Sequence, residues 1–175
     1  AHLAALLGTT AGTLEPPTIP AELAGVDDKP AAVVSIEGVL DPATFPFTTA
    51  TAAGNASAVA ALVGCPSSPA LWQRCNAAVL ASTRVARYAD ATDAPMFVIA
   101  ADRDAFISNY YQALVPLRTL TEKLGADHVW FDNVDTGTAK QYGGVDPRNH
   151  TMAVSYEVNF TALRQFLAGQ VSALG

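Results

Sequence analysis

Positive charge is scarce in this chain of 175 residues, and no stretch of the sequence is strongly basic. Ten Lys and Arg stand against 16 Asp and Glu, which gives a formal net charge of −6 at pH 7. Nucleic acids and anionic membrane surfaces attract proteins through clusters of basic side chains. The composition therefore argues against both as partners of this protein.

Long apolar runs are also lacking, although 50% of the residues are hydrophobic. Charged residues and prolines interrupt each run before it is long enough to span a bilayer, so we expect no membrane span. Only 15% of the residues are charged, a balance typical of a well-buried α/β domain rather than a disordered chain. A chain of this length is expected to form one domain with one core.

Cysteine is rare, with Cys65 and Cys75 as the only two. They lie ten positions apart across a Pro/Ser turn, and this spacing favours a disulfide that closes a small loop. Two buried free thiols are the alternative. The spacing fits none of the usual metal-ligand patterns, and no His cluster lies nearby, so no metal is expected. A disulfide would indicate an oxidising compartment, which makes a secreted or periplasmic protein the expectation.

Short apolar runs alternate with helical patterns along the chain. Strands are expected at AAVVSIEG (31–38), MFVIAA (96–101) and HVWFDNV (128–134). Helical spacing of apolar residues precedes, separates and follows these runs, at 1–10, 70–90, 109–124 and 151–169. Gly125 is expected to end the third of these helices.

The predicted fold class is α/β, because continuous apolar strands joined by helices favour a parallel sheet that is covered on both faces. Three strands make a thin sheet whose outer strand has an unpaired edge. We therefore expect residues 1–175 to form the C-terminal half of a larger domain. Such a piece buries less apolar surface per residue than a whole domain does.

Groups capable of chemistry follow two of the predicted strands. The second strand runs into Asp102 and Asp104, and the loop after the third strand leads to His150. Reactive groups gather beyond the carboxyl ends of parallel strands, where a carboxylate could orient an imidazole for general acid–base work. The alternative is that both Asp residues cap the next helix and His150 flanks the last one. His128, at the start of a strand, is expected to be structural.

The stretch AHLAALLGTT at 1–10 resembles the segment behind the nucleophile elbow of α/β-hydrolase-fold esterases. The resemblance is to the branch related to hormone-sensitive lipase, feruloyl esterase-like enzymes and carbohydrate esterases. In that branch a Gly-x-Ser-x-Gly turn precedes a small residue and then His-Leu-Ala-Ala-Leu-Leu. Ala1 matches the small residue, so the resemblance implies a nucleophilic Ser three positions upstream of Ala1. It also implies that 1–175 is a partial hydrolase domain without the N-terminal strands and the elbow.

The resemblance extends to the acid and histidine loops. MFVIAADRDAFI is similar to the family's strand and acid loop, and counting from Pro95 places the acid on Asp104. NHTMAVSYEVNFTALRQFL is similar to the family's histidine loop and last helix, which places the histidine on His150. The resulting order of Ser, Asp and His is the order of that fold. Ala100-Ala101 replaces the family's usual His-Gly, Ser108 replaces a Pro, and Asn149 replaces a Gly.

This resemblance implies a serine hydrolase that acts on a small-molecule ester. Ser would attack the carbonyl carbon, His150 would act as general base and then general acid, and Asp104 would orient His150. No metal or organic cofactor is needed, so none is expected. Val39 and Leu40, after the first strand, and Phe106 and Ile107, after the acid, are expected to border the substrate pocket. Ordinary loop packing is the alternative for these four.

Two other functions remain open from the sequence. The first is the C-terminal part of a prolyl-oligopeptidase-like peptidase, which has the same triad order. The second is a non-catalytic binding or scaffold protein with the hydrolase fold. The residue three positions before Ala1 separates these cases, since a Ser favours an enzyme and a Gly, Ala or Asn favours a binder. The chain by itself, without that Ser, is expected to be inactive. The sequence specifies no oligomeric state.

Overall fold

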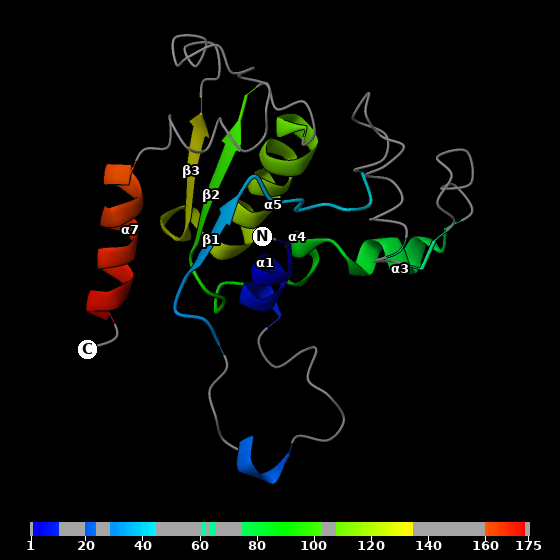
Figure 1. Cartoon of the computed structure of the whole chain (residues 1–175), viewed down its shortest axis with the longest axis horizontal. Coiled ribbons are helices and arrows are strands. Elements are labelled where there is room, and N and C mark those ends of the chain that lie inside the picture. The colour runs from blue at the N-terminus through cyan, green and yellow to red at the C-terminus, as the bar shows by residue number, and fades with distance from the viewer. Residues whose placement is uncertain are drawn as a thin grey trace.

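The computed structural model describes 2–10, 20–23, 29–44, 61, 64–65, 75–102, 108–134 and 160–173. Within these residues a three-stranded parallel sheet has helices packed against it, so the fold is α/β as the sequence predicts. The strands are β1 (Val33–Ile36), β2 (Met96–Ala101) and β3 (Val129–Val134), in the order β1-β2-β3. All three arrows point the same way in Figure 1.

The register of the sheet pairs the apolar residues of neighbouring strands. Val33 lies opposite Met96 and Ile36 opposite Ile99, while Met96 lies opposite Val129 on the other side. All six residues of β2 are buried, because β2 is the central strand and both of its faces are covered. A continuous run of aliphatic and aromatic residues is what a parallel strand in that position requires.

The helices form two layers on opposite faces of the sheet. α1 (His2–Thr9), α4 (Val85–Tyr88) and α5 (Val115–Leu124) lie on one face, and α7 (Phe160–Ala173) lies on the other (Figure 1). The remaining described helices are η1 (Ala21–Leu23), α3 (Ala77–Ser82), η4 (Tyr110–Leu114) and η5 (Ala126–His128). No described helix is long and apolar enough to cross a membrane.

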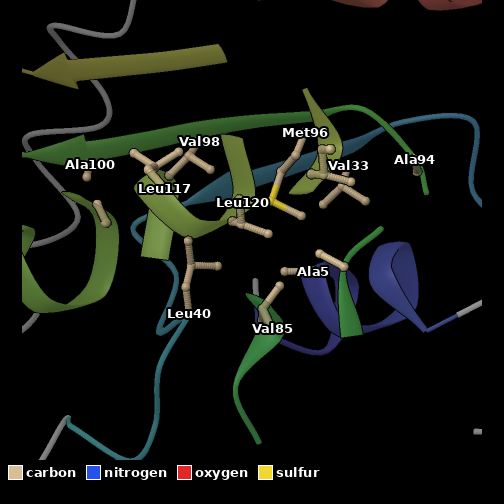
Figure 2. Close-up of a cluster of buried hydrophobic side chains, with 13 residues drawn as sticks. Ala5, Val33, Leu40, Val85, Ala94, Met96, Val98, Ala100, Leu117 and Leu120 are labelled. Carbon is tan, nitrogen blue, oxygen red and sulfur yellow. The ribbon is translucent and has the colours of Figure 1, made fainter. Parts of the chain in front are cut away.

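The side chains of β2 alternate between the two layers. Met96, Val98 and Ala100 belong to a cluster with residues from α1, α4 and α5, and Figure 2 shows these three facing Ala5, Val85, Leu117 and Leu120. Phe97, Ile99 and Ala101 belong to a second cluster with Phe166 of α7. The ring centroids of Phe97 and Phe166 are 5.4 Å apart. Burial on both sides supplies the apolar driving force for the layered fold.

The start of the helix before β3 differs from the sequence expectation. The spacing of Tyr110, Leu114 and Leu117 predicts one apolar α-helical face, but Tyr110–Leu114 is a π-helical turn that passes into α5. Tyr110 is 59% exposed and Leu114 is 44% exposed, whereas Leu117 is buried. A π turn makes i→i+5 hydrogen bonds, so it rotates the residues before it away from the α-helical phase.

Pro116 is the second residue of α5 and directly follows the junction with the π turn. Proline has no N–H, so one helical hydrogen bond is missing at this junction. The helix ends at Gly125, as expected, and this residue adopts a φ of 98° that favours glycine. Its N–H donates to the carbonyl of Thr121 at 3.0 Å. The helical pattern at 70–90 divides in the described part into α3 and α4, with Thr83 and Arg84 between them.

Candidate functional site

The carboxyl ends of the three strands meet at one edge of the sheet, as parallel pairing requires. Glu37 follows β1, Asp102 follows β2, and Asn133 is the second-last residue of β3. Asp102 is half-buried. The predicted site residues Asp104, Phe106, Ile107 and His150 lie outside the described residues, so their roles stay predictions. The described part fixes the starting points of the loops that carry them.

Helix α1 begins at this same edge of the sheet. Nδ1 of His2 lies 2.7 Å from the carbonyl oxygen of Val39, which follows β1. Near the other end of α1, the Gly8 carbonyl accepts from the N–H of Ala94 at 3.2 Å, just before β2 begins. α1 therefore runs antiparallel to the strands, from the carboxyl edge to the amino edge.

The His2 side chain is partly buried and makes a hydrogen bond to the loop after β1. Burial lowers the pKa of His2, and the hydrogen bond to the Val39 carbonyl opposes that shift. A carbonyl only accepts, so Nδ1 carries the proton in this contact. His2 thus anchors the first turn of α1 to the loop after β1, a contact that the sequence pattern does not specify.

The loop after β1 contains the expected pocket residues Val39 and Leu40. Val39 is half-buried, and its backbone carbonyl receives the His2 contact. The Leu40 side chain is fully buried in the core beside α4 and α5 (Figure 2), and its carbonyl accepts from Val85 N–H at 3.1 Å. A contact of either residue with an ester stays a prediction.

Gln112 holds this loop in place from the π turn. Its side chain is almost fully buried, and its Oε1 accepts from the Asp41 N–H at 2.9 Å. Its Nε2 donates to the Asp41 carbonyl at 3.0 Å and to Thr44 Oγ1 at 2.9 Å. The α-helical spacing gives no signal for this role, because the π turn is what brings Gln112 inward.

Asn109 connects the ends of the other two strands. Its Nδ2 donates to the Ala101 carbonyl at 3.1 Å and to Asn133 Oδ1 at 2.7 Å. Ala101 is the last residue of β2, directly before the acid loop, and Asn133 is one residue from the end of β3. One amide group therefore joins the points from which the acid loop and the loop to His150 depart.

Glu37 is another residue at this edge whose role the sequence pattern does not indicate. Its side chain is buried, and its N–H donates to the Ile99 carbonyl at 2.7 Å, which extends the ladder past β1. Its φ of 45° lies in the left-handed region, which is uncommon for a residue other than glycine. Backbone conformations of this kind gather at functional sites and tight turns.

Cys65 and Cys75 are joined in a disulfide, with their Cα atoms 5.3 Å apart. This is the pairing that the loop spacing favours over free thiols. A disulfide is compatible with an extracellular or periplasmic location. Among the residues that the structure describes, no group of three or more His, Cys, Asp and Glu side chains is placed to hold a metal ion.

Comparison with known proteins gives no further identification. No protein-family model, curated protein or solved structure matches this chain. The fold and the geometry of the carboxyl edge are therefore the basis for a functional proposal.

Proposed function

We propose that this chain is the part of an α/β-hydrolase-fold serine esterase that supplies the acid and the histidine of a Ser-Asp-His triad. The observation that carries the proposal is the position of α1. This helix begins at the carboxyl edge of the sheet, beside the loop after β1, and the strand that bears the acid loop ends at the same edge. A nucleophile elbow is a sharp turn from a strand into a helix at that edge.

The handedness of the fold supports the same arrangement. α1 covers the same face of the sheet as α4 and α5, which are the crossover helices between the described strands (Figure 1). Crossovers between parallel strands are right-handed in nearly all proteins. A strand leading into α1 by the same rule would pair with the open edge of β1. A Ser in the turn after that strand would then stand next to the loops of β1 and β2.

The mechanism assigns one step to each residue of the triad. The upstream Ser attacks the ester carbonyl, while His150 takes the Ser proton and returns it to the leaving alcohol. Asp104 accepts a hydrogen bond from His150, which fixes the tautomer and stabilises the imidazolium. The positive end of the α1 dipole favours the negative charge that develops beside its first turn. Backbone donors near the Ser are expected to bind the oxyanion, and loss of one such donor costs about 10²–10³ in rate.

The test is ester hydrolysis by a longer chain that includes the residues before Ala1. That chain is expected to hydrolyse p-nitrophenyl acetate, and Asp104→Asn and His150→Ala are each expected to lower kcat by about 10⁴-fold. Asp102→Asn is the matched control, because it removes a carboxylate at the same edge that the mechanism does not use. The 175-residue chain by itself is expected to give only the background rate.

Two outcomes would contradict the proposal. One is hydrolysis by the longer chain that survives the His150 change. The other is a loss on changing Asp102 that equals the loss on changing Asp104, which would show that the acid is misassigned. Reactivity with a fluorophosphonate probe, which labels activated serines, is a second measurement. It should disappear with His150→Ala even where the acetate ester is a poor substrate.

A further inference from the structure

A pocket of about 480 Å³ is lined by residues of α4, α5 and the loop after β1. Its volume is in the range of sites that bind small molecules. It is lined by backbone and side-chain atoms of Leu40, Asp41, Ala81, Arg84, Ala86, Arg87, Val115, Pro116, Thr119 and Lys123. The ester mechanism does not use its charged residues.

The charge of this pocket is opposite to that of the whole chain. Arg84, Arg87 and Lys123 supply three positive charges, and Asp41 supplies one negative charge, so the described residues of the lining carry +2. The chain as a whole carries −6. Like charges gathered in a concave, partly apolar site raise the local concentration of ions of the opposite sign. Three of the ten Lys and Arg in the sequence line this one pocket.

Asp41 fixes the orientation of Arg84 without using its whole guanidinium group. Oδ1 of Asp41 accepts from Nε of Arg84 at 3.2 Å and from the Ala43 N–H at 3.1 Å. The Asp41 side chain is only 13% exposed, and Gln112 holds its backbone from the other side. The two terminal nitrogens of Arg84 make no hydrogen bond within the described part of the chain. They are donors in a planar fork that suits an anionic oxygen pair.

Lys123 and Arg87 complete the positive wall of the pocket. Nζ of Lys123 donates one hydrogen bond to the Arg87 carbonyl at 3.0 Å, which ties the end of α5 to α4. An ammonium group has three protons, so two remain for a ligand. Arg87 lies in α4, and Arg84 is the residue directly before this helix. Its guanidinium carbon lies 5.9 Å from the centre of the Tyr88 ring.

The rest of the lining is apolar or neutral. Val115 and Pro116 stand at the start of α5, with Ala81 and Ala86 across from them on α3 and α4. The pocket could therefore contact both parts of an anionic ligand, the charged group through its basic residues and the apolar body through these neutral side chains. The Thr119 hydroxyl adds a neutral group that can donate or accept a hydrogen bond.

We propose that this pocket binds a small organic anion, with a carboxylate or phosphate group held by Arg84, Arg87 and Lys123 and an apolar body against the start of α5. None of these three side chains belongs to the triad, so the proposal does not rest on ester hydrolysis, although Leu40 lines this pocket and is also expected to border the ester pocket. It can therefore be tested on the 175-residue chain, whether or not that chain hydrolyses an ester.

The test is titration calorimetry with three probes of similar size, namely phenyl phosphate, benzoate and benzyl alcohol, at low ionic strength. Both anions are expected to bind saturably at one site, and the uncharged alcohol is not. The tighter of the two anions identifies the preferred head group. Arg84→Gln and Arg87→Gln are each expected to weaken anion binding by about ten-fold, as expected when a charged hydrogen bond is lost. Added salt should weaken binding as well.

Arg118→Gln is the matched control. Arg118 is on α5 but outside the pocket, with its Nε 3.2 Å from Oε1 of Glu122, so anion affinity should be unchanged. Amide chemical shifts give a second measurement on the unmodified chain, and the anions should shift Thr119 and Lys123 but not residues of α7. Failure of both anions to bind would overturn the proposal. So would equal binding of benzyl alcohol, or an equal loss of affinity in Arg118→Gln.

Discussion

At the scale of single residues, Gln112 is the clearest case of a polar group that the fold has to satisfy. The residue is 1% exposed, and the hydrogen bonds of its side chain go to Asp41 and Thr44. A buried amide with partners stabilises a loop, whereas the same loop without the amide leaves backbone groups unpaired. The conformation of the segment after β1 therefore depends on one side chain from a distant part of the sequence.

Replacing Gln112 by Leu tests this dependence. The change keeps the approximate volume but removes the acceptor of the Asp41 N–H, while the Asp41 carbonyl keeps its hydrogen bonds from Thr44. We therefore expect the free energy of unfolding to fall by about 2 kcal/mol. Urea denaturation followed by circular dichroism gives the value. Gln165→Leu, at an exposed position of α7, is the control and should stay within about 0.5 kcal/mol of the parent. A similar result for both variants would show that the Gln112 contacts contribute little.

A contact between two residues can be predicted from sequence when their chemistry and their separation along the chain both favour it. The ten-residue separation of Cys65 and Cys75 favours a closed loop, and the structure joins them. The full burial of the Leu40 side chain, by contrast, has no signal in the sequence, which places Leu40 in a loop. Whether a loop residue points inward depends on the helices that pack over it, and those come from distant segments.

At the scale of elements, α1 packs closely on β1 at Gly8. Gly8 of α1 lies so near Val33 that a Cβ added at Gly8 would overlap the Cγ2 of Val33. Valine is branched at Cβ and has little freedom to turn away. The helix and the strand can therefore approach this closely only because residue 8 has no side chain.

Gly8→Ala is expected to lower the free energy of unfolding by about 1–3 kcal/mol, the usual cost of overpacking in a core. Gly169→Ala is the matched control, because Gly169 is also helical but has no atom within 4 Å of an added Cβ. That change should raise stability by about 0.5–1 kcal/mol, since alanine favours the helix. Thermal unfolding of the two variants measures both effects. Stabilisation by both changes would contradict the close packing of α1 on β1.

The elements themselves are largely predictable from apolar patterns. The three strands fall within the runs expected at 31–38, 96–101 and 128–134, because each run is a short apolar block bounded by breakers. The last described helix continues past Gly169 to Ala173, since a single exposed glycine weakens a helix without ending it. The π turn at Tyr110–Leu114 could not be predicted, because the apolar spacing there is that of an α-helix and the contact of Gln112 with Asp41 joins distant segments.

At the scale of the whole molecule, stability should depend on pH through His2. Burial lowers the pKa of His2 in the folded state below its ordinary value of 6.5. The unfolded chain then binds more protons than the folded chain between these two pKa values, so stability rises with pH in that window. The contribution is fully present above pH 6.5 and is lost as the pH falls through the folded pKa.

The measurement is the free energy of unfolding between pH 5 and pH 8 for the parent and for His2→Asn. We expect the parent to lose stability on acidification below pH 6.5, and the variant to follow a flatter curve. Burial raises the pKa of Asp93 above 3.8, which makes a contribution of the opposite sign that is lost as the pH rises through its folded value. Asp93→Asn in the His2→Asn background separates the two. Curves that remain parallel for the parent and His2→Asn would show that His2 does not carry the effect.

The layered arrangement of the whole molecule follows from the sequence, and the details of its candidate site follow only in part. Alternation of strands and helices predicts a parallel sheet between helical layers, because each apolar face needs a cover. The contacts of Asn109 and His2 could not be foreseen, since each joins segments that only the folded topology brings together. Roles for Asp104 and His150 still rest on the proposed mechanism.

The π turn before α5 has a consequence for how the chain can change in length. An i→i+5 turn contains one more residue than an α-helical turn that spans the same ends. Deleting one residue there would restore α-helical phase without moving Leu117, Leu120 or Leu124 relative to the core. The same deletion would turn Gln112 out of reach of Asp41. In this segment, one surplus residue separates a helix that only covers the sheet from a helix that also holds the loop after β1.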